Sequence, residues 1–187
     1  TEKNSLVVNG MSASNRGSAF ANSGIVVSVT PKDVKEYVKQ PELSLMKFQQ
    51  ECERKMYIQN QVAPAQRISD FVVGKKSHNI ASTSYPSGLH ACNMNEYLPK
   101  IVAEHLKEGF KVFDRRIKGF ISNQATMIGL ESRTSSPVRI LRDKDSLQHP
   151  QISMLFPCGE GAGYAGGITS SAIDGVNAAI KISQILK

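Results

Sequence analysis

The sequence predicts an α+β fold that closes with a strand, a glycine-rich turn and a helix. Apolar residues recur with the helical period over 41–56 and 99–117, whereas the β-branched runs at 24–29 and 138–142 are typical of strands. Near the C-terminus, five glycines fall within the nine residues 159–167, directly before a long amphipathic segment. We therefore expect a mixed domain over most of the chain and one strand–turn–helix unit at its end.

The N-terminal segment predicts two short strands and a helix. Residues 5–10 form the first expected strand, which ends at the turn dipeptide Asn9-Gly10, and residues 24–29 form the second. A helix should follow directly, because Thr30 suits an N-cap and Pro31 suits the first helical position.

A longer helix is expected after Pro41, with one apolar stripe along it. The stripe consists of Leu45, Phe48, Cys52 and Met56. Glu53 is assigned to another face of this helix. Because Cys52 lies in the stripe, we interpret it as a core residue rather than a reactive thiol.

The middle of the chain is less regular. Residues 63–67 break the helical pattern, 68–73 form a short apolar piece of undecided type, and 74–88 are expected to be a polar loop. The longest helix should run from Pro99 to Ile117, with Gly119 just after its end.

Strand-like composition returns in the last third of the chain. Residues 125–143 contain two such runs, and Ile152–Phe156 is expected to be the strand that leads into the glycine-rich turn. The pattern divides the chain into an α+β domain over 1–143 and a closing unit over 144–187.

Composition excludes several classes of protein. The net charge of +7 is spread along the chain without a nucleic-acid-binding motif, so a nucleic-acid partner is not favoured. No apolar window is long enough for a membrane span and no signal peptide is recognisable, so a cytoplasmic location is expected. The three cysteines and four histidines lack metal-ligand spacing, and no metal site is expected.

The glycine-rich stretch contains the spacing of a dinucleotide fingerprint, Gly161-x-Gly163-x-x-Gly166. That fingerprint normally opens a βαβ unit of about 30 residues. Only one helix follows Gly166, so a self-contained Rossmann site is not expected. The stretch should instead close a nucleotide fold that opens elsewhere.

Glu160 changes the expected ligand of this stretch. A carboxylate is unsuited to a phosphate-binding loop, whereas it can accept hydrogen bonds from ligand hydroxyl groups. The helix that starts after Gly167 directs amides and the positive end of its dipole at a further electron-rich group. The ribitol and ring of a flavin fit this arrangement better than a pyrophosphate; the alternative is a tight turn without a ligand.

A second polar block, residues 131–139, places Ser and Thr residues around Arg133. Arg offers a planar fork of donors, and the hydroxyl groups add short ones, so a carboxylate, carbonyl or phosphate would suit the block. An ordinary polar turn with an exposed Arg is the equal alternative.

Five blocks of the sequence, in collinear order, resemble the C-terminal half of bacterial FAD-dependent dehydrogenases, which are related in fold to the glutathione-reductase-like flavoproteins. The blocks are Leu6–Met11, Ala21–Val27, Ala63–Arg67, Glu131–Ile140 and Pro157–Ile168. The resemblance implies that 1–143 is an inserted, substrate-side domain and that 144–187 completes an FAD-binding, Rossmann-like domain. The N-terminal Rossmann half, which holds the adenosine part of FAD, is expected to be absent from this α/β flavoprotein fragment.

The resemblance also implies site residues. The expected FAD-binding residues are Glu160, Gly161, Gly163, Gly166, Gly167, Ile168 and Thr169, with Glu160 on the ribitol and the helix start on the flavin pyrimidine edge. The residues expected to face the flavin or the substrate are Arg67, Arg133, Thr134, Ser135 and Ser136.

The implied function is that of a fragment of an FAD-dependent oxidoreductase, which transfers hydride between flavin and a small organic substrate, with NAD(P)H as a further expected reductant. The implied partners are the substrate, the missing N-terminal half and a second copy of the chain. The alternative is a non-catalytic flavoprotein remnant that acts as an oligomerising or anion-binding module.

Overall fold

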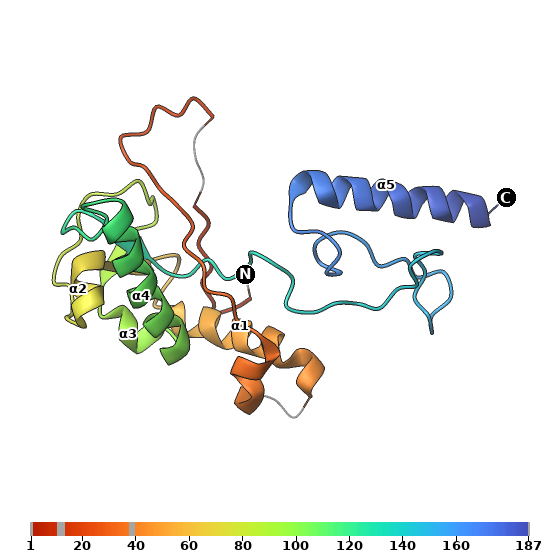
Figure 1. Cartoon of the computed structure of the whole chain (residues 1–187), viewed down its shortest axis with the longest axis horizontal. Coiled ribbons are helices and arrows are strands. Elements are labelled where there is room, and N and C mark those ends of the chain that lie inside the picture. The colour runs from red at the N-terminus through yellow and green to blue at the C-terminus, as the bar shows by residue number, and fades with distance from the viewer. Residues whose placement is uncertain (1, 11–13, 38–39, 187) are drawn as a thin grey trace. The chain divides into compact units, whose positions relative to one another are not determined.

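The computed structural model describes residues 2–10, 14–37 and 40–186, and it has an α+β fold (Figure 1). The chain forms two compact units. Unit 1 comprises Thr1–Val34 and Lys47–Ser132, and unit 2 comprises Lys35–Met46 and Arg133–Lys187. The assignment of 1–143 to a substrate-side domain and of 144–187 to an FAD-binding domain stays a prediction.

The helices occupy most of the positions that the apolar periodicity predicts. The helical elements are η1 (Pro31–Tyr37), η2 (Pro41–Leu43), α1 (Ser44–Met56), α2 (Ile68–Val73), α3 (Met94–Tyr97), α4 (Lys100–Arg116) and α5 (Ile168–Ile185). The predicted helices at 41–56, 99–117 and 168–186 are thus confirmed as α1, α4 and α5, and the undecided segment 68–73 is helical.

Unit 1 contains a three-stranded sheet in the order β2–β1–β3. The central strand β1 (Ala63–Arg67) pairs in parallel with β2 (Leu89–Ala91) and antiparallel with β3 (Thr126–Ile128). Residues 63–67, which were expected only to break the helical pattern, thus form the central strand of the sheet. Ala63 and Ala65 are fully buried on one face of β1, and Pro64 and Gln66 are buried on the other, so the central strand is covered on both faces. Pro64 cannot donate to the ladder, but its carbonyl oxygen accepts the Gly129 N–H at 3.1 Å.

The core of unit 1 forms where the helices cover this sheet. Phe71 of α2 meets Phe110 of α4 edge to face, with ring centroids 5.9 Å apart. Met56 and Met94 are fully buried in the same cluster. Cys52 is buried on α1, and its burial raises the pKa of the thiol to about 12, which confirms it as a core residue.

The strands expected at 5–10 and 24–29 are not formed in the part of the chain that is described. The backbone there makes isolated hydrogen bonds instead of a ladder: Leu6 N–H donates to Glu53 O at 3.0 Å and Val8 N–H to Leu130 O at 2.9 Å. Ile25 and Val27 still pack on the core, while Val26 is exposed. The segment 24–29 thus alternates between the core and solvent without a sheet partner, so the strand predicted from its β-branched residues is wrong.

In unit 2, the strands expected at 138–142 and 152–156 are also absent. Residues 149–155 instead form a turn, in which the His149 ring nitrogen accepts the N–H groups of Gln151 and Ile152, both at 3.1 Å. Ile152 and Met154 are about half exposed, at 52% and 50%. A strand needs a neighbouring strand to satisfy its backbone, and the described residues of unit 2 provide none. The closing unit is thus a turn and a helix without the expected strand.

Candidate functional site

The glycine-rich turn, residues 159–167, is a hydrogen-bonded structure that rests on the extended segment 136–142. Within the turn, Gly163 N–H donates to Glu160 O at 2.9 Å and Tyr164 N–H to Gly159 O at 3.0 Å. Toward the segment, Ala162 O accepts the Ile140 N–H at 3.2 Å. The Tyr164 hydroxyl donates to the Ile140 carbonyl at 2.9 Å.

The glycines of the turn serve two different purposes. Gly163 has a φ of +84°, and a Cβ there would lie 2.7 Å from the Val138 carbonyl oxygen, so this glycine is required for packing within the chain. No atom of the described residues lies within 4 Å of the Cβ position at Gly161 or Gly166. Those two glycines therefore leave room beside the backbone that the fold itself does not use.

An ion pair joins the turn to α5. The guanidinium of Arg142 and the carboxylate of Asp174 form two hydrogen bonds of 2.7 and 3.0 Å, and the side chains are only 10% and 14% exposed. Asp174 also accepts the Gly159 N–H at 2.8 Å. The bond from Arg142, followed by that from Gly159, lowers the pKa of the Asp174 carboxyl. Arg142 stacks over the Tyr164 ring at 3.7 Å.

The predicted FAD-binding residues lie on this turn and on the first turn of α5. Glu160 is exposed, and its carboxylate has no hydrogen-bond or ion-pair partner among the described residues. Gly167 is the N-cap of α5, and its N–H donates to the Ser170 hydroxyl at 3.1 Å. Gly167 has no side chain, so it cannot cap the N–H groups of the first helical turn. The Ile168 side chain is 93% exposed. A free carboxylate and a helix start whose first N–H groups have no side-chain cap are thus held on one continuous segment.

The predicted block Arg133–Ser136 reaches the turn through its last residue. The Ser136 hydroxyl donates to Val138 O at 2.8 Å and contacts Gly161 O at 3.2 Å. Arg133, Thr134 and Ser135 are exposed.

The start of this block is fixed by a residue that the sequence did not single out. The carboxylate of Glu53, only 2% exposed, accepts the Ser132 hydroxyl at 2.7 Å. Glu53 lies beside the apolar stripe of α1, as its position directly after Cys52 requires, but the structure also buries that side of the helix. The sequence signal for this burial was the position of Glu53 next to the apolar stripe.

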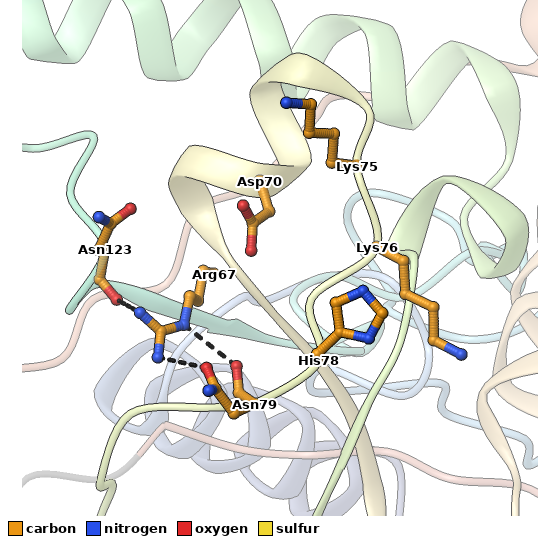
Figure 2. Close-up of a pocket in the computed structure, with 7 residues that line it drawn as sticks. All are labelled: Arg67, Asp70, Lys75, Lys76, His78, Asn79 and Asn123. Atoms are coloured by element: carbon orange, nitrogen blue, oxygen red, sulfur yellow. Dashed lines mark hydrogen bonds between the residues drawn. The ribbon is translucent and has the colours of Figure 1, made fainter.

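Arg67, the remaining predicted residue, lies in unit 1 and lines a shallow basic pocket of about 590 Å³. The basic pocket is lined by Arg67, Asp70, Lys75, Lys76, His78, Asn79 and Asn123. Figure 2 shows the guanidinium held between Asn123 and Asn79, with Asp70 above it and His78 to its right. Arg67 donates to the carbonyl oxygens of Asn79 at 3.1 Å and Asn123 at 2.9 Å, and to the Asn79 side chain.

Buried polar residues fix the walls of the basic pocket. Gln66, fully buried on β1, donates to Lys75 O at 2.6 Å and accepts the Met94 N–H at 2.7 Å. Ser77, 1% exposed, donates to the Asp70 carboxylate at 2.6 Å and accepts the Arg67 backbone N–H at 3.0 Å. These bonds attach the loop after α2 to the end of β1. Sequence reasoning assigned that loop no role; its Lys75-Lys76 and His78, close together in a polar loop, were the available signal.

Two kinds of feature are absent from the described part of the chain. No helix there is long and apolar enough to cross a membrane. No three side chains from among the described His, Cys, Asp and Glu residues gather in a group that could hold a metal ion.

Comparison with known proteins gives the family. The family described as "FAD-dependent protein, C-terminal domain-like" matches residues 1–134 of the 187. An uncharacterized protein of Clostridium beijerinckii is 41% identical over 189 residues, a match that covers 98% of this chain and 35% of the relative. The chain therefore spans about a third of the length of that relative. The basic pocket lies inside the residues matched by the family, whereas the glycine-rich turn lies beyond them. On this match, the chain belongs to the FAD-dependent protein family as its C-terminal-domain-like part.

Proposed function

We propose that this chain supplies the flavin-facing half of the FAD site in an oxidoreductase that passes hydride between flavin and a small organic substrate. The observation that carries the proposal is the glycine-rich turn, which presents on one segment the unpartnered Glu160 carboxylate and the start of α5, whose N-cap Gly167 has no side chain to cap the first N–H groups. Membership of an FAD-dependent family supports the choice of cofactor.

The residues of the turn fit the ribitol side of a flavin. Glu160 would accept hydrogen bonds from ribitol hydroxyl groups, because an ionised carboxylate is an acceptor only. Gly161 and Gly166, with open space at their Cβ positions, would let the ligand approach the backbone closely.

The start of α5 fits the ring side. The N–H groups of Ile168 and Thr169 would donate to the oxygen-rich pyrimidine edge, where the positive end of the helix dipole is also favourable. The exposed Ile168 side chain would be covered by the ligand or by its neighbouring protein surface. The bound flavin would supply the hydride chemistry, and the protein would position it.

The adenosine half of the site would come from outside this chain. The Clostridium beijerinckii relative is about three times as long as the aligned region, which supports the proposal that the chain completes a larger, glutathione-reductase-like FAD domain. Under this proposal the chain meets the riboflavin part of FAD but not its ADP part.

A titration with flavins tests this division of the cofactor. Riboflavin and FAD should bind weakly, with comparable dissociation constants measured from the quenching of flavin fluorescence. ADP should not compete with either. Glu160→Ala should weaken riboflavin binding by about tenfold, because it removes a hydrogen bond to a charged acceptor.

Glu42→Ala is the matched control, since Glu42 is an exposed carboxylate of the same unit outside the glycine-rich turn. Competition by ADP, or equal riboflavin binding by the Glu160 and Glu42 variants, would contradict the assignment of the flavin-facing half.

A second candidate function is an interaction module without catalytic activity. It is favoured by α5, which exposes Ile173, Val176 and Ile180 at 57%, 58% and 51%. These residues recur at i, i+3 and i+7 and form one apolar face. In this candidate the face binds a second copy of the chain or the remainder of a longer flavoprotein.

A further inference from the structure

We propose that the basic pocket of unit 1 is a binding site for a small oxyanion, the carboxylate or phosphate group of a small organic ligand. The basic pocket is separate from the glycine-rich turn, and the inference does not depend on the proposed flavin site. Four observations support it: the donors left on Arg67, the charge of the lining, the mixed chemistry around Asp70, and the rigidity of the walls.

Arg67 retains donors after its contacts within the protein are satisfied. A guanidinium carries five N–H donors. Three are used, on the Asn79 carbonyl, the Asn79 side chain and the Asn123 carbonyl. Two N–H donors of Arg67 remain, on a guanidinium whose plane is already fixed by the other three bonds. A pair of donors on a fixed guanidinium is the arrangement that binds a carboxylate or a phosphate through two oxygens.

The lining carries an excess of positive charge. Arg67, Lys75 and Lys76 outnumber the single carboxylate, Asp70. Neither lysine ammonium group forms a hydrogen bond or ion pair with another described side chain. In Figure 2 the Lys75 ammonium lies above the Arg67 guanidinium and the Lys76 ammonium lies to its right. The two lysines can therefore attract an anion while Arg67 orients it.

Asp70 restricts the kind of anion that fits. One carboxylate oxygen of Asp70 accepts the Ser77 hydroxyl at 2.6 Å, and the other has no hydrogen-bond donor among the described residues. A ligand hydroxyl would satisfy that oxygen, whereas a second anionic group beside it would be repelled. The preferred ligand class is a small organic acid or phosphate ester that also carries a hydroxyl group.

The walls of the basic pocket are held in place by buried polar bonds. Ser77 and Gln66 connect the loop to β1 and α2 through hydrogen bonds of 2.6–3.0 Å. Because both side chains are buried, breaking these bonds would leave unsatisfied polar groups. The arrangement of Arg67 and Asp70 is therefore preorganised, so binding does not include the entropic cost of ordering the loop.

Titration of the ¹⁵N-labelled chain tests the proposal. Inorganic phosphate, succinate and malate, a hydroxy acid, are each added at constant ionic strength, and the Arg67 side-chain Nε–H and the backbone amides of Lys76, His78 and Asn79 are followed by NMR. Saturable shifts at these groups are expected, with malate binding more tightly than succinate. If phosphate binds more tightly than either acid, the site is assigned to phosphate groups; the reverse order assigns it to carboxylates.

Variants separate the site from general surface charge. Lys76→Gln should weaken the tightest of the three ligands by roughly two- to fivefold, as expected for one partly solvated charge. Arg67→Lys should weaken it by at least about tenfold, because a lysine cannot reproduce the two-oxygen contact.

Lys100→Gln is the matched control, since Lys100 is a lysine of the same unit whose side chain is 90% exposed and lies outside the basic pocket. Shifts that grow without saturation for all three ligands, or an equal response of the Lys76 and Lys100 variants, would overturn the proposal. The Lys76 variant leaves the Arg67 hydrogen bonds untouched, so the test holds even if the Arg67 variant does not fold.

Discussion

Gly163 is the residue of the glycine-rich turn on which the local structure depends most. Its positive φ of +84° is strained for a residue with a side chain, and a Cβ would lie 2.7 Å from the Val138 carbonyl. The middle glycine of the apparent fingerprint thus allows contact with the chain's own backbone rather than with a pyrophosphate. A glycine spacing that is typical of dinucleotide-binding loops thus serves packing within the chain at Gly163.

Gly163→Ala should therefore destabilise the protein by about 1–3 kcal/mol, the range for a strained backbone conformation. The free energy of unfolding, measured by urea denaturation, checks this value. Gly161→Ala is the control, because no described atom lies within 4 Å of its Cβ position and its φ is not in the left-handed region. Equal stabilities of the two variants would show that the 2.7 Å approach is not a constraint.

At the scale of elements, α5 is attached to its unit along one face and exposed along another. Ser171, Asp174, Ala178 and Ile182 lie on the attached face, where Ala178 is 3% exposed. The pair of Arg142 and Asp174 provides the polar part of this attachment and connects the helix to the turn.

The charge of Asp174 should make this attachment depend on pH. Its folded-state pKa lies below the ordinary value of 3.8, so the ionised carboxylate stabilises the fold above that value. This contribution is lost as the pH falls through the lowered pKa. Asp174→Asn should cost about 1.5 kcal/mol near neutral pH.

Urea denaturation of the wild type and of Asp174→Asn at a series of pH values checks this prediction. The stability difference should be constant well above pH 3.8 and should shrink progressively as the pH falls through that value and below it. The other carboxyls with lowered pKa, such as Asp33 and Asp143, titrate equally in both proteins and cancel in the difference. A difference that persists unchanged into acid would mean that the charge of Asp174 is not responsible.

The element scale also shows why β1 escaped prediction. Residues 63–67 have no β-branched residue and contain a proline, so local propensity gives no strand signal. They form the central strand because parallel and antiparallel partners, 89–91 and 126–128, lie on either side. Strand pairing between distant segments is a tertiary property.

At the scale of the whole molecule, the two candidate sites belong to different compact units. All residues of unit 1 lie within the family match, which ends at residue 134, two residues after the end of the unit at Ser132. The glycine-rich turn and α5 belong to unit 2. A substitution in the basic pocket should therefore impair oxyanion binding without affecting flavin binding, and a substitution in the glycine-rich turn should do the reverse.

The exposed face of α5 should determine how the isolated chain assembles. Burial of Ile173, Val176 and Ile180 between two copies would remove apolar surface from water, so the chain should self-associate as its concentration rises. Replacing these three residues with Ser should give a monomer, as measured by sedimentation equilibrium. A chain that stays monomeric in both forms would contradict self-association through this face.

The sequence by itself determined the long amphipathic helices, the core role of Cys52 and the family resemblance. Each of these depends on local periodicity or on blocks of residues in order, which require no knowledge of distant contacts. Only the tertiary structure decided that 63–67 is a central strand, that 152–156 is a turn, and that Glu53 is buried. It alone brought Arg67 together with the loop at 75–79. The physical reason is the same in each case: backbone hydrogen bonds and buried polar groups are satisfied by partners far away in the chain.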